Sequence, residues 1–83
     1  MLTVNAKFAA KELVPGLVNG EYSIEEGATI RELLKVCETA CGASVPEKNY
    51  VLMYPLYNGR PATLESAINE DGTLHLCRVI VGG

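Results

Sequence analysis

One capped amphipathic helix, "TIRELLKVCETACG" at residues 29–42, most constrains what this chain can fold into. Thr29 is expected to be the N-cap, and Glu32 three residues later completes a capping box that satisfies two free backbone N–H groups. Gly42 can take the left-handed conformation that ends a helix. The apolar side chains form a single stripe, made by Ile30, Leu33, Leu34, Cys37 and Cys41. The opposite face is expected to be solvated, and it carries Arg31, Glu32, Lys35, Glu38 and Thr39.

Two alternating segments before the helix predict an antiparallel hairpin. Residues 2–8 place every second, apolar side chain on one face, and "EYSIEE" at 21–26 does the same with Tyr22 and Ile24. Pro15-Gly16 and Asn19-Gly20 supply two turn signals between the segments. These signals leave the register of the hairpin open.

The segment "YVLMYPLY" at 50–57 is apolar along its whole length and predicts a strand, preceded by a loop at "SVPEKN". A strand that is apolar on both faces either lies in a two-sided core or shows one face to a partner. Pro55 cannot donate to a ladder, which favours an edge or a bulge. Two interpretations remain open. Either the strand lies bulged under the last loop, or it is close to an edge with parts of Tyr50, Met53, Tyr54 and Tyr57 exposed for contact.

The last third of the chain predicts a hairpin, a single turn and a final strand. Asn58-Gly59 suits a tight type I′ turn. "TLESAI" is expected to form one turn with Leu64 and Ile68 inward. "TLHLCRVIV" is expected to be a strand, with Leu74 and Leu76 facing the core and His75 and Cys77 facing the other way. The element order predicts a single α+β domain over 1–83, with one helix on one face of a mixed sheet of four or five strands.

Composition excludes several classes of function. A net charge of −3 argues against nucleic acid as the main partner and fits a partner with a basic docking surface. No segment approaches the length of a membrane span, and the start, "MLTVNAKF", is not a signal peptide. Three cysteines cannot all pair, which favours free thiols in a reducing cytoplasm. We therefore expect a cytoplasmic protein without a membrane partner.

No residue pattern indicates catalysis or a metal site in this chain. His75 is isolated and is expected to be a surface residue, and Cys77 has only Arg78 beside it as a cation that could lower a thiol pKa. Glu25-Glu26 and Glu70-Asp71 flank turns and are expected to solvate them. Metal-ligand spacing, a phosphate loop and a nucleophile elbow are all missing from the sequence. The chain is thus expected to have no catalytic residues and no bound cofactor.

The sequence resembles the ubiquitin-like β-grasp superfamily. "EEGATIRELL" leads into the single helix, and "YNGRPATLESAINEDGTLHLCRVIVGG" completes the pattern. "TLHL" followed by seven residues ending in Gly82-Gly83 is similar to ubiquitin, whereas "RVIVGG" is more similar to the sulfur carriers of the ThiS and MoaD group. The resemblance covers nearly the whole chain, and its most specific part is the Gly-Gly tail.

The resemblance implies a carrier that is charged by other enzymes. An E1-like adenylyltransferase of the ThiF or MoeB type would use ATP and magnesium to adenylate Gly83. Sulfur from a donor would then replace AMP, and the thiocarboxylate would pass sulfur to a synthase that accepts it. The pathway, either thiamine or molybdopterin biosynthesis, stays open. Without a Cβ, Gly82 and Gly83 would let the backbone pass through a narrow active-site channel.

The docking residues are expected on the tail and on the sheet surface away from the helix. By analogy with the superfamily, they are Val79, Ile80, Val81, Arg78, Cys77, His75, Met53 and Tyr54. Two other functions share parts of this interpretation. One is a ubiquitin-like modifier joined to lysines through Gly83, and the other is a plain protein-interaction domain whose Gly-Gly end is accidental.

Overall fold

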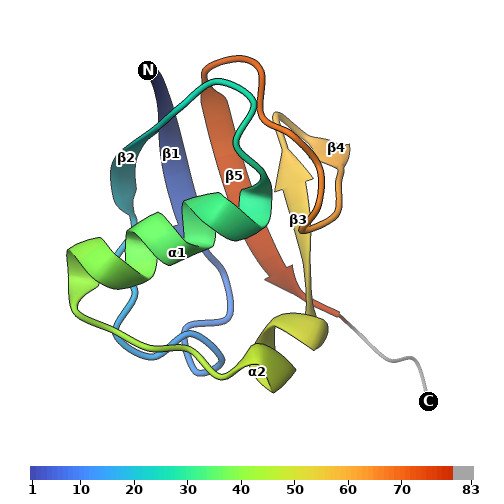
Figure 1. The fold of residues 1–83 in the computed structure, drawn as a ribbon. Coiled ribbons are helices and arrows are strands. Elements are labelled where there is room, and N and C mark those ends of the chain that lie inside the picture. The colour runs from blue at the N-terminus through green and yellow to red at the C-terminus, as the bar shows by residue number, and fades with distance from the viewer. Residues whose placement is uncertain (80–83) are drawn as a thin grey trace.

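Five strands form one mixed sheet, and a long helix crosses one face of it in the computed structural model, which describes residues 1–79 (Figure 1). The strand order is β2-β1-β5-β3-β4, so the parallel pair β1 and β5 lies at the centre. All the other neighbouring strands pair antiparallel. The elements are β1 (Leu2–Phe8), β2 (Gly20–Ile24), α1 (Ile30–Cys41), α2 (Glu47–Val51), β3 (Met53–Tyr57), β4 (Arg60–Pro61) and β5 (Gly72–Arg78).

The helix α1 forms as its sequence predicts. Thr29 and Glu32 make the reciprocal capping box, and Gly42 ends the helix in the left-handed conformation with φ 63°. The apolar stripe packs on the sheet, where Leu33 and Cys37 are fully buried. This face meets the inward side chains of the central strands, among them Val4 and Leu74. Local capping and a single stripe therefore set both the length and the orientation of this helix.

The first hairpin is joined by a long connection, residues 9–19, instead of a tight turn. The connection contacts α2 and the last residue of α1, and it buries Val14 and Leu17 in the core. The side chain of Asn19 accepts a hydrogen bond from the backbone N–H of Phe8 at 2.9 Å, which holds the two ends of the connection together. Asn19-Gly20 therefore lies at the start of β2, where the Asn19 side chain bonds to the end of β1.

The predicted strand at 50–57 is wrong in its first part. Residues 47–51 form the short helix α2, and β3 begins only at Met53. Helix and strand cannot be told apart by periodicity in a short apolar run. Here tertiary contacts favour the helix, because Tyr50 packs into the core and the Asn49 amide donates to the Leu13 carbonyl at 2.8 Å.

Glu38 was expected on the solvated face of α1, and that prediction is wrong. Its carboxylate is buried and accepts a hydrogen bond from the Tyr50 hydroxyl at 2.5 Å. A buried carboxylate needs such a donor, and Tyr50 reaches it only because α2 packs beside α1. Burial, with the adjacent carboxylate second, raises the pKa of Tyr50.

Pro55 lies in β3, which is next to the edge strand β4. This confirms the prediction of an edge-proximal strand. The Pro55 carbonyl accepts from the Ala62 N–H at 3.0 Å, so the proline nitrogen faces the β4 side and not the central strand β5. The missing N–H therefore costs no bond to β5. At the other end of β3, Asn58 and Gly59 both have positive φ, of 53° and 80°, as a type I′ turn requires.

Candidate functional site

The carboxyl end of β5 is the candidate functional site, because the tail singled out by the sequence continues from it. β5 runs between β1 and β3 and ends at Arg78. Val79, the next residue, donates its N–H to the Leu52 carbonyl at 2.8 Å. This bond extends the β3–β5 pairing by one step and fixes where the described chain leaves the sheet (Figure 1). Residues 80–83, which include the predicted Gly82-Gly83 tail, Ile80 and Val81, lie outside the described residues.

The helix-free face of the sheet carries His75 and Cys77 from β5, as predicted. Lys7 and Leu56 lie opposite His75 on the two neighbouring strands, and Tyr54 lies opposite Cys77. Side chains directly opposite one another in a sheet point to the same face. The sheet therefore brings together His75, Cys77 and Tyr54 of the predicted docking set.

Two members of that set do not share this face. Met53 and Arg78 lie opposite each other, one residue out of step with Tyr54 and Cys77, so both point to the side of the helix. Met53 is buried in the core, which contradicts the expectation that it is exposed, and Tyr50 is buried as well. Arg78 reaches the rim of the sheet, 3.7 Å from Glu12.

Leu52 and Val51 belong to the exposed surface at this point, although the sequence analysis did not select them. Leu52 is 48% exposed and Val51 74% exposed. Both side chains are exposed because α2 ends at Val51 and Leu52 then connects it to β3. Strand alternation does not extend to Leu52, which has φ −86° and ψ 4° at the end of α2, so no local signal in the sequence selects it.

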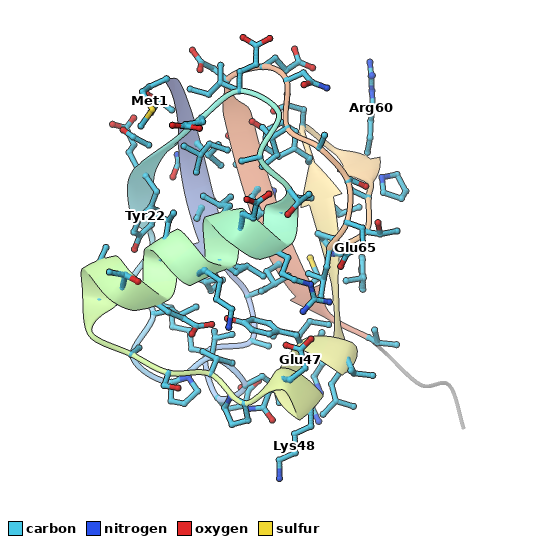
Figure 2. All side chains as sticks on the ribbon, viewed as in Figure 1. Met1, Tyr22, Glu47, Lys48, Arg60 and Glu65 are labelled. Atoms are coloured by element: carbon cyan, nitrogen blue, oxygen red, sulfur yellow. The ribbon has the colours of Figure 1, made fainter. Side chains whose placement is uncertain are left out.

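Both signs of charge occur at each end of the sheet, but acidic groups dominate where β5 starts, with Arg60 of β4 among them (Figure 2). The loops at the start of β5 and before α1 carry Glu25, Glu26, Glu70 and Asp71, all exposed. At the opposite end, Lys48 points outward from α2 and Arg78 lies at the sheet rim (Figure 2). Lys11 is also at that end, as are Glu12 and Glu47, whereas Lys7 lies opposite His75 in the middle of the sheet. The negative net charge of the chain therefore does not describe the surface around the end of β5.

The helix α2 is held in place by polar contacts on two sides. Arg31 of α1 forms ion pairs with Glu47 of α2 and, at 2.8 Å, with Glu65 of the segment that precedes β5 (Figure 2). Tyr50 bonds Glu38 on the inner side. These contacts give the junction of α2 and β3 a fixed position next to Val79.

The thiols show no arrangement for catalysis within residues 1–79. Cys37 is buried, and burial, followed by the nearby Cys41, raises its pKa from 9.0 to about 12. Cys41 lies 3.2 Å from the Tyr22 hydroxyl, and Cys77 is half-buried on the helix-free face. All three are free, and the described residues contain no cluster of potential metal ligands. Among the same residues, no helix has the length and apolar character needed to span a bilayer.

The fold is a ubiquitin-like β-grasp, with a mixed five-stranded sheet covered on one face by α1. No protein-family model matches the chain, and no curated protein sequence matches it. Similar solved structures include small archaeal modifier protein 1 from Haloferax volcanii, which is 17% identical over 96% of this chain and 100% of that chain, with a TM-score of 0.69. A protein from Pyrococcus furiosus named for molybdopterin converting factor, subunit 1, is 14% identical over 96% of this chain and 100% of that chain, with a TM-score of 0.66.

The same fold also occurs as part of a larger protein chain. ATBAG1, solved in complex with HSP70, is 17% identical over 94% of this chain but only 40% of its own, with a TM-score of 0.58. At these identities the comparisons establish the fold, and the function has to be argued from the residues of this chain.

Proposed function

We propose that the chain is a sulfur carrier, a protein cosubstrate that is charged at Gly83 by other enzymes. The observation that carries the proposal is the sequence Gly82-Gly83 a few residues beyond the central strand of a β-grasp fold. The similarity to a protein named for molybdopterin converting factor supports it. The chain itself brings the reacting carboxyl group, and no resident cofactor is part of the proposal.

The proposed chemistry begins with activation of the α-carboxylate of Gly83. A carboxylate is an anion at neutral pH and a poor electrophile. An E1-like adenylyltransferase would therefore join it to the α-phosphate of ATP, with magnesium, and release pyrophosphate. A persulfide of a donor protein then attacks the acyl adenylate, displaces AMP and forms an acyl disulfide. A thiol of the donor or of a small reductant attacks the donor sulfur of that disulfide, so that a new disulfide forms and the Gly83 thiocarboxylate leaves. A synthase transfers the sulfur of the thiocarboxylate to a biosynthetic intermediate, and the carboxylate of Gly83 is regenerated by water. Cytoplasmic location and the molybdopterin or thiamine pathway belong to this proposal.

Accurate-mass analysis of the native protein tests the proposal. Trypsin cleaves after Arg78 and releases Val79–Gly83, which contains neither methionine nor cysteine. Oxidation of those side chains therefore cannot imitate the replacement of oxygen by sulfur in this peptide. We expect the thiocarboxylate form in the native protein and its absence from cells that lack the activating enzyme. Only the plain carboxylate, or a peptide that continues past Gly83, would contradict the carrier proposal.

A protein modifier is the second candidate, favoured by the similarity to small archaeal modifier protein 1. Both functions share the adenylate, and they differ in whether a lysine amine or a sulfur nucleophile attacks it. In a modifier, trypsin would leave Val-Ile-Val-Gly-Gly attached to lysines of other proteins. Finding that remnant without the thiocarboxylate would replace the first proposal with the second.

Shortening the tail separates both functions from a plain interaction domain. We expect deletion of Gly82-Gly83 to abolish ATP–pyrophosphate exchange with the activating enzyme. Alanine at both positions should reduce the exchange, because the added Cβ atoms restrict the backbone inside a narrow channel. Full biological function of the deleted chain would favour the interaction domain.

A further inference from the structure

We propose that an exposed apolar patch at the junction of α2 and β3 is the docking site for the enzyme that activates the tail. The proposal rests on the proposed function and adds the residues of the docking site and the chemistry of the partner surface. The patch consists of Val51, Leu52, Tyr54 and Val79, which we call the tail-root patch. Its partner is a surface that is apolar at the centre and acidic around it.

The four side chains come from two segments of the chain, residues 51–54 and Val79, which the fold brings side by side. Their exposed fractions are 74% for Val51, 48% for Leu52, 42% for Tyr54 and 39% for Val79. The backbone bond from Val79 to Leu52 places these two side by side, and Tyr54 lies on the next pair along the strands, opposite Cys77. The other large exposed apolar side chains of residues 1–79 are scattered over other elements: Met1, Val18 and Val36.

The middle of the helix-free face offers a partner much less apolar surface. Its central row places Lys7 and His75 side by side, with Leu56 next to His75. The row before it pairs Asn5 with Thr73. An apolar contact with a partner therefore falls at the end of the face, on the tail-root patch. Apolar groups gathered on an otherwise polar surface commonly mark an interaction site.

The position of the patch identifies its occupant. An extended chain advances at most ~3.5 Å per residue, so the four residues after Val79 can carry the carboxyl group of Gly83 no further than about 14 Å. An enzyme that holds that carboxyl group in its active site must therefore cover the surface next to Val79. The tail-root patch is the apolar part of that surface.

The charges around the patch set the chemistry of the partner. Lys48 projects from α2 near the patch, and its neighbour Glu47 is paired with Arg31 of α1 (Figure 2). Arg78 precedes Val79 at the sheet rim, where Glu12 lies 3.7 Å away and offsets part of its charge. The exposed carboxylates Glu70 and Asp71 lie at the opposite end of β5. Electrostatic complementarity then calls for acidic groups around an apolar pocket on the enzyme. This departs from the basic partner surface that net charge alone suggests.

The test is ATP–pyrophosphate exchange by the E1-like adenylyltransferase of the same cells, with the full chain as substrate. We compare the wild type with the double variants V51E/L52E and V51K/L52K, using V18E as the matched control for an exposed valine on another element. We expect V51E/L52E to raise KM about tenfold or more with little change in kcat. V51K/L52K should raise KM less, because its charge agrees with that of the surrounding lysine and arginine. V18E should behave as the wild type, and thermal unfolding of each variant checks that it folds.

Each other outcome overturns a defined part of the proposal. A wild-type KM for V51E/L52E, or an equal rise for V18E, overturns the patch as the docking site while tail activation stands. Equal rises for the glutamate and lysine variants overturn the acidic surround. Absence of exchange with the wild type overturns the proposed function, and the docking site falls with it.

Discussion

β5 begins among polar loops and ends among exposed apolar side chains. At its start, the Asn58 side chain accepts from the Thr73 N–H, and the Asp71 carboxylate accepts from the Thr3 N–H, both at 2.9 Å. The Tyr57 hydroxyl donates to the Glu70 carbonyl at 2.6 Å. At its end, the backbone bond from Val79 to Leu52 is surrounded by the tail-root patch.

This difference suggests a division of roles along one strand. The first end satisfies its polar groups within the molecule, and its apolar residues face the core. The second end leaves apolar side chains in contact with water, an arrangement that adds little to folding. We infer that the first end stabilises the fold and that the second end is kept for a partner. The predictions below test this division by comparing matched substitutions.

The largest effect is expected from Leu74→Ala, in the first half of β5. Leu74 is fully buried against α1, so truncation removes apolar contacts and leaves a cavity. We expect a loss of about 2–5 kcal/mol in the free energy of unfolding, measured by urea denaturation. In a domain of this size that is a large part of the total stability. A loss below about 1 kcal/mol would show that this end of β5 does not anchor the fold.

Tyr50→Phe should have the next largest effect. The change removes the donor to the buried Glu38 carboxylate and is expected to cost about 1–3 kcal/mol. Tyr57→Phe is the matched control, because its hydroxyl bonds the exposed Glu70 carbonyl, which water can satisfy instead. Urea denaturation of both variants compares the two contacts. Equal losses would mean that the buried pair does not hold α2 more firmly than an exposed hydrogen bond would.

The features that the sequence predicted correctly depend on residues close together in the chain. The capping box spans four residues, the Asn58-Gly59 turn is set by its own two residues, and β5 alternates over its own length. The errors involve partners that are distant in the chain. Glu38 is buried because Tyr50 reaches it from α2, and α2 forms partly because Asn49 finds a carbonyl 36 residues earlier.

The candidate site shows the same limit. Alternation placed His75 and Cys77 on the helix-free face, but the boundary between α2 and β3 decided which side Met53 takes. Because the sequence predicted a strand over residues 50–57, nothing distinguished Val51 and Leu52 from the rest of that strand. Only the contact between Leu52 and Val79 shows that these residues lie at the root of the tail. That contact joins segments that no local pattern connects.

An alkaline pH series should reveal the buried thiol of Cys37. Its pKa is raised from 9.0 to about 12, so the unfolded chain loses this proton at a lower pH than the folded chain. Between pH 9 and 12 the unfolded state binds fewer protons, and stability falls as pH rises. We expect a loss of ~1 kcal/mol from this group by pH 10, in urea denaturation at pH 8 and pH 10. The raised pKa of Tyr50 acts in the same direction.

The variant Cys37→Ala separates the contribution of the thiol to this loss of stability from that of the tyrosines. The variant should start less stable at pH 8 but lose less on going to pH 10, because it lacks the buried thiol. Identical slopes for wild type and Cys37→Ala would contradict the raised pKa.

Leu52→Ala should have the smallest effect on stability. It is the same chemical change as Leu74→Ala, made at the residue that links α2 to β3, where the side chain is 48% exposed. Because water already reaches it, we expect a change within about 0.5 kcal/mol by urea denaturation, while binding to the activating enzyme weakens. A loss near that of Leu74→Ala would place Leu52 in the core and end the division between the two ends of β5. A small loss of stability together with impaired activation would show that folding does not require an apolar residue at this position. The apolar side chain would then serve the contact with the partner.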